Sequence, residues 1–198
     1  MLGSITPLGE RGRGSRWWLT VSAYLLGSIV GGAVMGGFAG WLGAMIGVGS
    51  WPVSARLAAI AAALVVGLAL DLGVGGMRLP TIHRQVEEEW RGRYRGWVWG
   101  LAFGFQLALG VVTIVTTSAV YVTWLAAAMS GSVTGGIAIG VAFGLARAAP
   151  ILAVAGVRNP AQLLGVDATL LRLAMPARRL GYTACGGIAA VAIAGAAR

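Results

Sequence analysis

Long apolar runs separated by short polar stretches dominate this chain. Each run continues for about 18 residues or more without a regular polar face, which is typical of helices that cross a membrane. A chain in lipid must satisfy its backbone hydrogen bonds internally, and the short alternating segments of a β-barrel are missing from the sequence, so we expect helices. The expected segments are residues 17–47, 57–74, 97–129, 137–157 and 180–197.

The first and third segments are longer than a bilayer requires. As one helix, residues 17–47 would extend about 46 Å, whereas the hydrocarbon core is about 30 Å thick, so this helix has to tilt, bend or end in the interface. We expect residues 17–198 to form one all-helical (all-α) domain of a polytopic integral membrane protein, with about five transmembrane helices. Residues 1–16 would form a cytoplasmic N-terminal segment.

The composition supports a membrane protein. Of the 198 residues, 58% are hydrophobic and 11% are charged, whereas about 25% of the residues of a soluble domain are charged. The net charge of +9 would suggest a nucleic-acid partner in a soluble chain, but here the arginines lie between the apolar runs, where orientation signals belong. The lipid bilayer is therefore the expected surrounding, and no nucleic-acid partner is expected.

The arginines also predict how the chain is oriented. They cluster before the first segment, between the second and third, and between the fourth and fifth, whereas the other two connections carry none beyond Arg56 at one border. The positive-inside rule then predicts a multi-pass protein of the cell (inner) membrane with a cytoplasmic N-terminus and an outside C-terminus. Five tryptophans at segment ends are expected as interfacial anchors. These are Trp17, Trp18, Trp51, Trp97 and Trp99.

The longest polar stretch, TIHRQVEEEWRGRYRGW, carries a candidate docking site. Glu87, Glu88 and Glu89 are followed by Arg91, and Glu87 and Arg91 have the spacing of neighbours on one face of a helix. This stretch is either a docking site for a membrane or cytoplasmic protein partner or a solvated connector.

A weak internal repeat has a period of 80 residues. The sequence RGR occurs at residues 11–13 and 91–93, and Trp17 corresponds to Trp97. Many transporters contain such repeats, but two connections on the same membrane face also favour the same residues.

Arg147 is the sharpest candidate site residue. It lies near the middle of the fourth segment, where a charge is costly and by default suggests function. Asp71, toward the cytoplasmic end of the second segment, lies at a comparable depth and is its expected partner. The two would handle an anion or a proton. The alternatives are a structural ion pair, or an Arg147 side chain that extends to the interface. Pro150 is expected to kink the segment just beyond.

Polar side chains in the third segment form a second candidate, a substrate or ion path. They are Gln106, Thr113, Thr116 and Thr117. Thr113 and Thr117 are four residues apart and share one helix face. Their hydroxyls either line a polar path or bond neighbouring helices and bend their own.

Catalytic and metal chemistry has little support in the sequence. One cysteine, Cys185, excludes an intramolecular disulfide, and one histidine, His83, cannot build a histidine-rich metal site. The sequence contains no phosphate loop and no nucleophile–base arrangement. We expect no catalytic residue, no metal and no cofactor.

Four stretches resemble helices of the cytochrome c biogenesis transmembrane family of the CcdA/DsbD type. They are YLLGSIVGGAVMGGFAGWLGAMIG, SARLAAIAAALVVGLALDLGVGGMRLP, RGWVWGLAFGFQLALG and GGIAIGVAFGLARAAPILAVA. The resemblance covers most of residues 17–160 and implies that scaffold in shortened form, without its first helix. The family's two redox cysteines have no counterpart, and Cys185 matches neither position. The resemblance therefore implies the fold and argues against the family's thiol–disulfide exchange, which needs two thiols.

Three functions follow as hypotheses. The first is transport of a small solute or ion past Arg147, Gln106 and the threonines. The second is a non-catalytic membrane subunit that binds or assembles a partner. The third is a thiol-redox component completed by a partner chain, which would supply the missing helix and cysteine.

Overall fold

The computed structural model describes residues 7, 16–74, 95–110, 117–157 and 159–196. All regular elements within these residues are helices, which confirms the expected all-helical class. In chain order they are α2 (Trp17–Met45), the 3-10 turn η2 (Val48–Ser50), α3 (Val53–Asp71), α5 (Gly96–Leu109), α6 (Ala119–Met129), α7 (Val133–Ala148), the 3-10 helix η4 (Ala149–Val154) and α8 (Pro160–Ala196).

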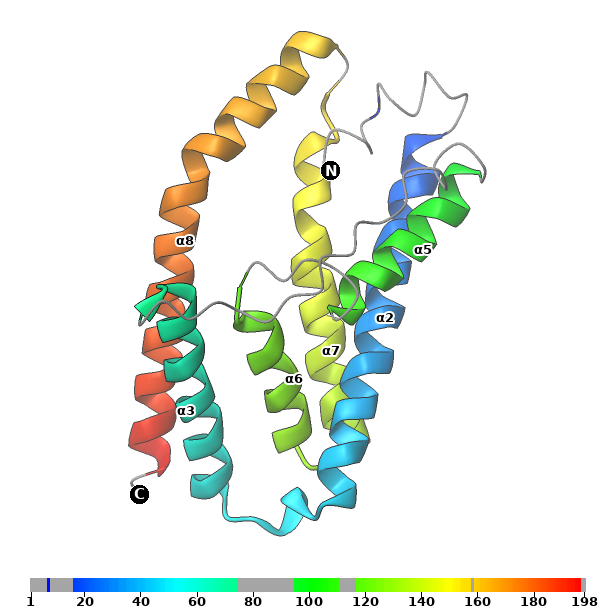
Figure 1. Cartoon of the computed structure of the whole chain (residues 1–198). Helices are drawn as coiled ribbons and strands as arrows, with labels where there is room; N and C mark the ends of the chain where they lie inside the picture. Colours follow the sequence, from blue (N-terminus) through cyan, green and yellow to red (C-terminus); the bar gives the residue numbers. More distant parts are fainter. Residues whose placement is uncertain (1–6, 8–15, 75–94, 111–116, 158, 197–198) are drawn as a thin grey trace.

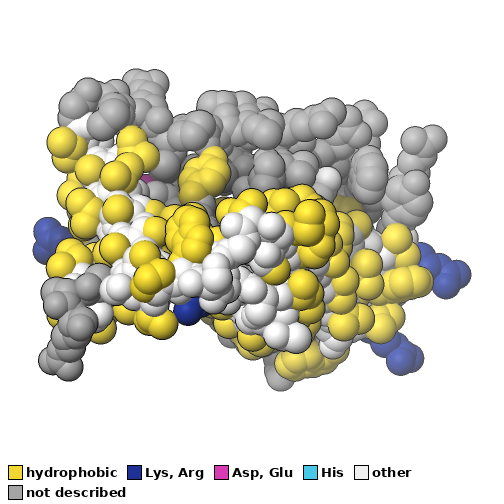
Figure 2. All heavy atoms as spheres, turned by 90° about the horizontal axis from the view of Figure 1, so that it is seen from below, with side chains coloured by type: hydrophobic (Ala, Val, Ile, Leu, Met, Phe, Trp, Pro, Cys, Tyr) yellow, Lys and Arg dark blue, Asp and Glu magenta, His cyan; other side chains and the backbone are white. Residues whose placement is uncertain are grey.

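Three helical stretches are long and apolar enough to cross a membrane. They are Trp17–Met45, Val53–Asp71 and Val133–Val154. Three further apolar helical stretches are shorter, Gly96–Leu109, Ala119–Met129 and Arg179–Gly195. Hydrophobic side chains cover much of the described surface in the view from below (Figure 2). Lengths and surface are thus compatible with association with a membrane.

Helix α2 is the centre of the packing. Its N-terminal half contacts α5, the stretch from Ser28 to Gly40 contacts α7, and Gly43 near its C-terminus contacts α6. On the other side of the molecule α3 packs against α8, and α6 lies between α3 and the α2–α7 pair (Figure 1). This arrangement places α6 at the junction of the two groups of helices.

Glycines allow α2 and α7 to pack so closely that their backbones are in contact. A Cβ atom on Gly32 would overlap the carbonyl oxygen of Gly140, and a Cβ on Gly140 would overlap that of Gly32. Gly36 and Gly136 are related in the same way one turn away. Small residues spaced by four are the usual means of close helix packing in membranes. The two helices are antiparallel, since rising numbers on α2 meet falling numbers on α7.

The contact between α2 and α5 follows the same principle with parallel helices. A Cβ on Gly100 would lie 2.6 Å from the carbonyl oxygen of Thr20, and a Cβ on Gly104 would overlap the carbonyl of Tyr24. The two residues of each pair are 80 positions apart in the sequence, which is the period of the weak repeat. Residues that correspond in sequence therefore lie side by side in α2 and α5.

Aromatic side chains fill the core next to these contacts. The rings of Trp99 and Phe103 stack with centroids 5.0 Å apart, and Phe103 and Tyr24 stack at 5.8 Å. Trp17 and Trp99 are each only 7% exposed, because their rings pack inward between helices, whereas Trp18, Trp51 and Trp97 are exposed. The place of all five as interfacial anchors stays a prediction.

The expected single helix over residues 97–129 is two helices. α5 ends at Leu109, where Gly110 adopts a left-handed backbone with φ of 68° and caps the helix. A Cβ on Gly110 would lie 2.7 Å from the side chain of Val120. Glycine at this position therefore permits both the turn and its contact with α6.

The last two helices also differ from the expected segments. α7 gives way at Ala149 to the 3-10 helix η4, with Pro150 in its first turn, as expected for a residue without a backbone N–H. α8 is one helix of 37 residues with Pro176 inside it, about 55 Å long at 1.5 Å per residue. The expected fifth segment is thus the second half of a longer helix.

Candidate functional site

A polar cluster joins the end of α3 to the start of α6. Asp71 is the last residue of α3, and Ser118 is the N-cap of α6. The Asp71 carboxylate accepts hydrogen bonds from the hydroxyls of Thr117 (2.9 Å) and Ser118 (2.8 Å). It also accepts one from the backbone N–H of Ser118, 2.9 Å from one oxygen and 3.2 Å from the other. A carboxylate is favourable here because a helix N-terminus carries partial positive charge.

The same cluster extends to α8. The Tyr182 hydroxyl lies 3.5 Å from the backbone carbonyl oxygen of Asp71. Three helices therefore meet at Asp71, although it is only half-buried. Because its carboxylate already accepts several hydrogen bonds from the protein, the arrangement is suited to holding helices together.

A second polar site surrounds Arg147 in the last turn of α7. Its guanidinium carbon lies 5.8 Å from the centroid of the Phe143 ring, within the range of a cation–π contact. Tyr24 on α2 is its electrostatic neighbour. The half-buried cation thus lies beside aromatic side chains between α2 and α7.

Polar groups in the neighbourhood of Arg147 are held inside the protein. The Ser28 hydroxyl donates to the carbonyl of Tyr24 at 2.9 Å and lies 3.3 Å from that of Gly104. The ring of Trp124 meets Phe143 edge-on, with centroids 5.1 Å apart. The buried indole N–H of Trp124 has no acceptor among the described residues.

The structure brings together only part of the predicted site. Asp71 and Thr117 meet, but the Asp71–Arg147 pairing is not formed among the described residues, because Asp71 faces the start of α6. Gln106 is half-buried on α5. The other predicted residues, Thr113, Thr116, Glu87, Glu88, Glu89 and Arg91, lie outside the described residues.

Two members of the cluster were not singled out from the sequence. Tyr182 comes from a distant helix, and nothing in the sequence pattern indicates its contact. Ser118 had a usable signal, since serine directly before an apolar run is a common N-cap.

The described part of the chain contains neither a cluster of metal ligands nor a pair of thiols. No group of three or more His, Cys, Asp or Glu side chains there could hold a metal ion. Cys185 is a free, half-buried thiol on α8.

Comparison with known proteins gives a consistent set of relatives. The chain is 32% identical over 155 residues to the methylamine utilization protein MauF of Paracoccus versutus, a match that covers 75% of this chain and 56% of that protein. For MauF of Methylophilus methylotrophus the identity is 31% over 158 residues, with 76% and 53% covered. For MauF of Paracoccus denitrificans it is 32% over 152 residues, with 75% and 54% covered. No family model and no solved structure matches the chain.

These relatives correct the resemblance inferred from the sequence. They are methylamine utilization proteins, not members of the cytochrome c biogenesis family of the CcdA/DsbD type, so that assignment is wrong. The glycine and aliphatic patterns that suggested it are explained by close helix packing, as at Gly32 and Gly140, and such packing recurs in unrelated membrane bundles. The transporter and thiol-redox hypotheses built on that scaffold are withdrawn with it. The chain spans about half the length of the MauF proteins that it matches, and it is similar to them over three quarters of its own length.

Proposed function

We propose that this chain is a helical membrane protein that serves methylamine utilization. The observation that carries the proposal is the similarity to MauF, with 32% identity over 155 residues. The apolar lengths of α2, α3 and Val133–Val154 support a place in the membrane. Because the chain spans about half of those relatives, the proposal concerns the region that the two share.

We further propose five crossings with a cytoplasmic N-terminus. α2, α3 and Val133–Val154 would each cross once. α5 and α6 would share one crossing, and Arg179–Gly195 would make the last. The arginine-rich stretches support this orientation, since they fall on alternate connections of such a path.

We propose different roles for the two polar sites, the Asp71 cluster and the surroundings of Arg147. The Asp71 cluster supports the fold, since its carboxylate is satisfied by Thr117 and Ser118. Arg147 is the residue that we propose for function, because a cation among apolar helices is costly and by default suggests a functional role. A protein partner at Glu87, Glu88, Glu89 and Arg91 stays a prediction.

Deletion of the gene from its host tests the proposal. The deletion strain is expected to lose growth on methylamine as the sole nitrogen source and to regain it when the gene is restored. Growth on ammonium is the control and is expected to remain normal. Equal growth of the deletion strain on both nitrogen sources would contradict a role in methylamine utilization.

A further inference from the structure

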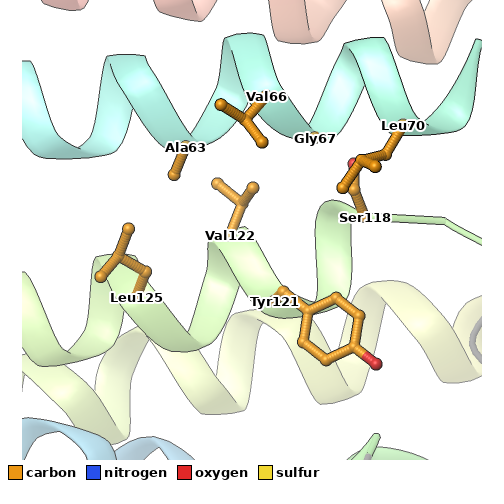
Figure 3. A pocket seen from close by; sticks show the side chains of 8 residues that line it. All are labelled: Ala63, Val66, Gly67, Leu70, Ser118, Tyr121, Val122 and Leu125. Carbon is orange, nitrogen blue, oxygen red and sulfur yellow. The ribbon is translucent and has the colours of Figure 1, made fainter. Parts of the chain in front are cut away.

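An apolar groove lies between α3 and α6. It has a volume of about 320 Å³, at the small end of the range of ligand pockets. Ala63, Val66 and Leu70 line it from α3, and Val122 and Leu125 from α6 (Figure 3). Since Ala63 and Leu70 are seven residues apart, the groove is about 10 Å long.

The chemistry of the groove favours a hydrocarbon chain. Aliphatic side chains form most of its walls (Figure 3). The Ser118 hydroxyl at one end donates to Asp71 at 2.8 Å, so its hydrogen is already used. Apart from the hydroxyl oxygens of Ser118 and Tyr121, the lining offers a polar ligand nothing to replace its hydration, whereas an alkyl chain needs no such contacts. Both walls are apolar helices, which would place the groove within reach of acyl chains.

A positive charge lies beyond the Ser118 end of the groove. Tyr182 contacts the carbonyl of Asp71, and the exposed Arg179 is three residues before Tyr182 on α8. Three residues of helix amount to about 4.5 Å along the axis. Arg179 thus lies about one turn of α8 beyond the Ser118 end of the groove, at the height of lipid headgroups for a chain that fills the groove. The charge selects an anionic headgroup.

We propose that the groove between α3 and α6 binds one acyl chain of an anionic phospholipid whose headgroup contacts Arg179. The acyl chain would lie along the groove beside the contact between Gly67 on α3 and Ser118 on α6. This inference rests on the proposed place in the membrane, on the groove and on the charge, and it is independent of the role in methylamine utilization.

Photolabelling of the purified full chain tests the proposal. The protein is placed in phosphatidylcholine nanodiscs that contain phosphatidylglycerol with a diazirine on its acyl chain, and adducts are mapped by mass spectrometry. We expect adducts on the groove-lining parts of α3 and α6. Val66→Trp fills the groove and is expected to lower labelling about tenfold. Val65→Trp, at an exposed neighbour that does not line the groove, is expected to leave it unchanged.

The headgroup is tested by changing one charge. Arg179→Gln is expected to remove the preference for phosphatidylglycerol over a phosphatidylcholine probe with the same diazirine, whereas Arg172→Gln, two turns away, keeps it. Equal labelling of Val66→Trp and Val65→Trp, or no headgroup preference in the unaltered protein, overturns the proposal in favour of ordinary surrounding lipid. If Val66→Trp does not fold, Ala63→Leu takes its place, because the larger side chain fills the end of the groove away from Ser118 and should also lower labelling.

Discussion

Gly32 on α2 and Gly140 on α7 face each other so closely that a methyl group on either would overlap the carbonyl oxygen of the other. The contact is reciprocal, and Gly36 and Gly136 repeat it one turn away. Backbone atoms, not side chains, therefore determine the distance between α2 and α7.

Gly140→Ala is expected to destabilise the protein by about 1–3 kcal/mol, because the added methyl group forces two backbones apart. Gly181→Ala on α8 is the matched control, since a Cβ there meets nothing within 4 Å. Alanine is the better helix former by about 1 kcal/mol, so the control should be neutral or slightly stabilising. Thermal unfolding in detergent measures both. A melting temperature that is lowered equally in the two variants would contradict the packing argument.

Asp71→Ala is expected to destabilise the junction of α3 and α6, because Ser118 and Thr117 lose their acceptor and the start of α6 loses a carboxylate. The expected cost is about 1–3 kcal/mol. Ser118→Ala and the double variant complete a cycle of melting temperatures. Since both residues act through one contact, the double variant should lose less stability than the sum of the losses in the two single variants. Strict additivity would mean that the two residues act separately.

The apolar runs predicted the helices well, because a membrane-spanning helix needs little more than length and hydrophobicity. α2 begins at Trp17, where the first run was expected to begin, and α3 ends at Asp71, near the expected end. The break after Leu109 was not predicted. Gly110 lies within an unbroken apolar run, and its close approach to Val120 on another helix cannot be read from that run.

The site was harder to predict than the helices. Arg147 and Asp71 were singled out as unusual charges in apolar runs of the sequence, and equal depth suggested that they would pair. Depth alone does not determine which way a side chain points around its helix. Asp71 points to the start of α6, a partner that became visible only once the third segment was seen to be two helices.

The proposed orientation predicts the outcome of reporter fusions. Alkaline phosphatase, which is active only outside the cytoplasm, should be active when fused after Arg198 and inactive when fused after residue 75. A green fluorescent protein at the same two positions should give the opposite pattern. Phosphatase activity at residue 75 together with inactivity after Arg198 would invert the topology and contradict the assignment based on arginines.

Cys185→Ser is expected to leave growth on methylamine unchanged. The thiol is half-buried on α8, and thiol–disulfide exchange needs a second thiol, which this chain does not contain. Growth rate on methylamine, compared at equal protein level, is the measurement. A loss of growth that Cys185→Ala shares would restore a thiol function for this residue.

Arg147→Gln is expected to abolish or strongly slow growth on methylamine while the protein still accumulates in the membrane. Glutamine retains a polar side chain, although a shorter one, and removes the charge beside Tyr24 and Phe143. The lost cation–π contact costs only about 1–2 kcal/mol of stability. Arg147→Lys restores the charge and should recover part of the growth. Arg56→Gln, at the opposite end of the helical bundle, is the control and should grow normally. If Arg147→Gln grows as the unaltered strain does, the charge only supports the fold. A parallel drop in melting temperature and in protein level for Arg147→Gln would lead to that same conclusion.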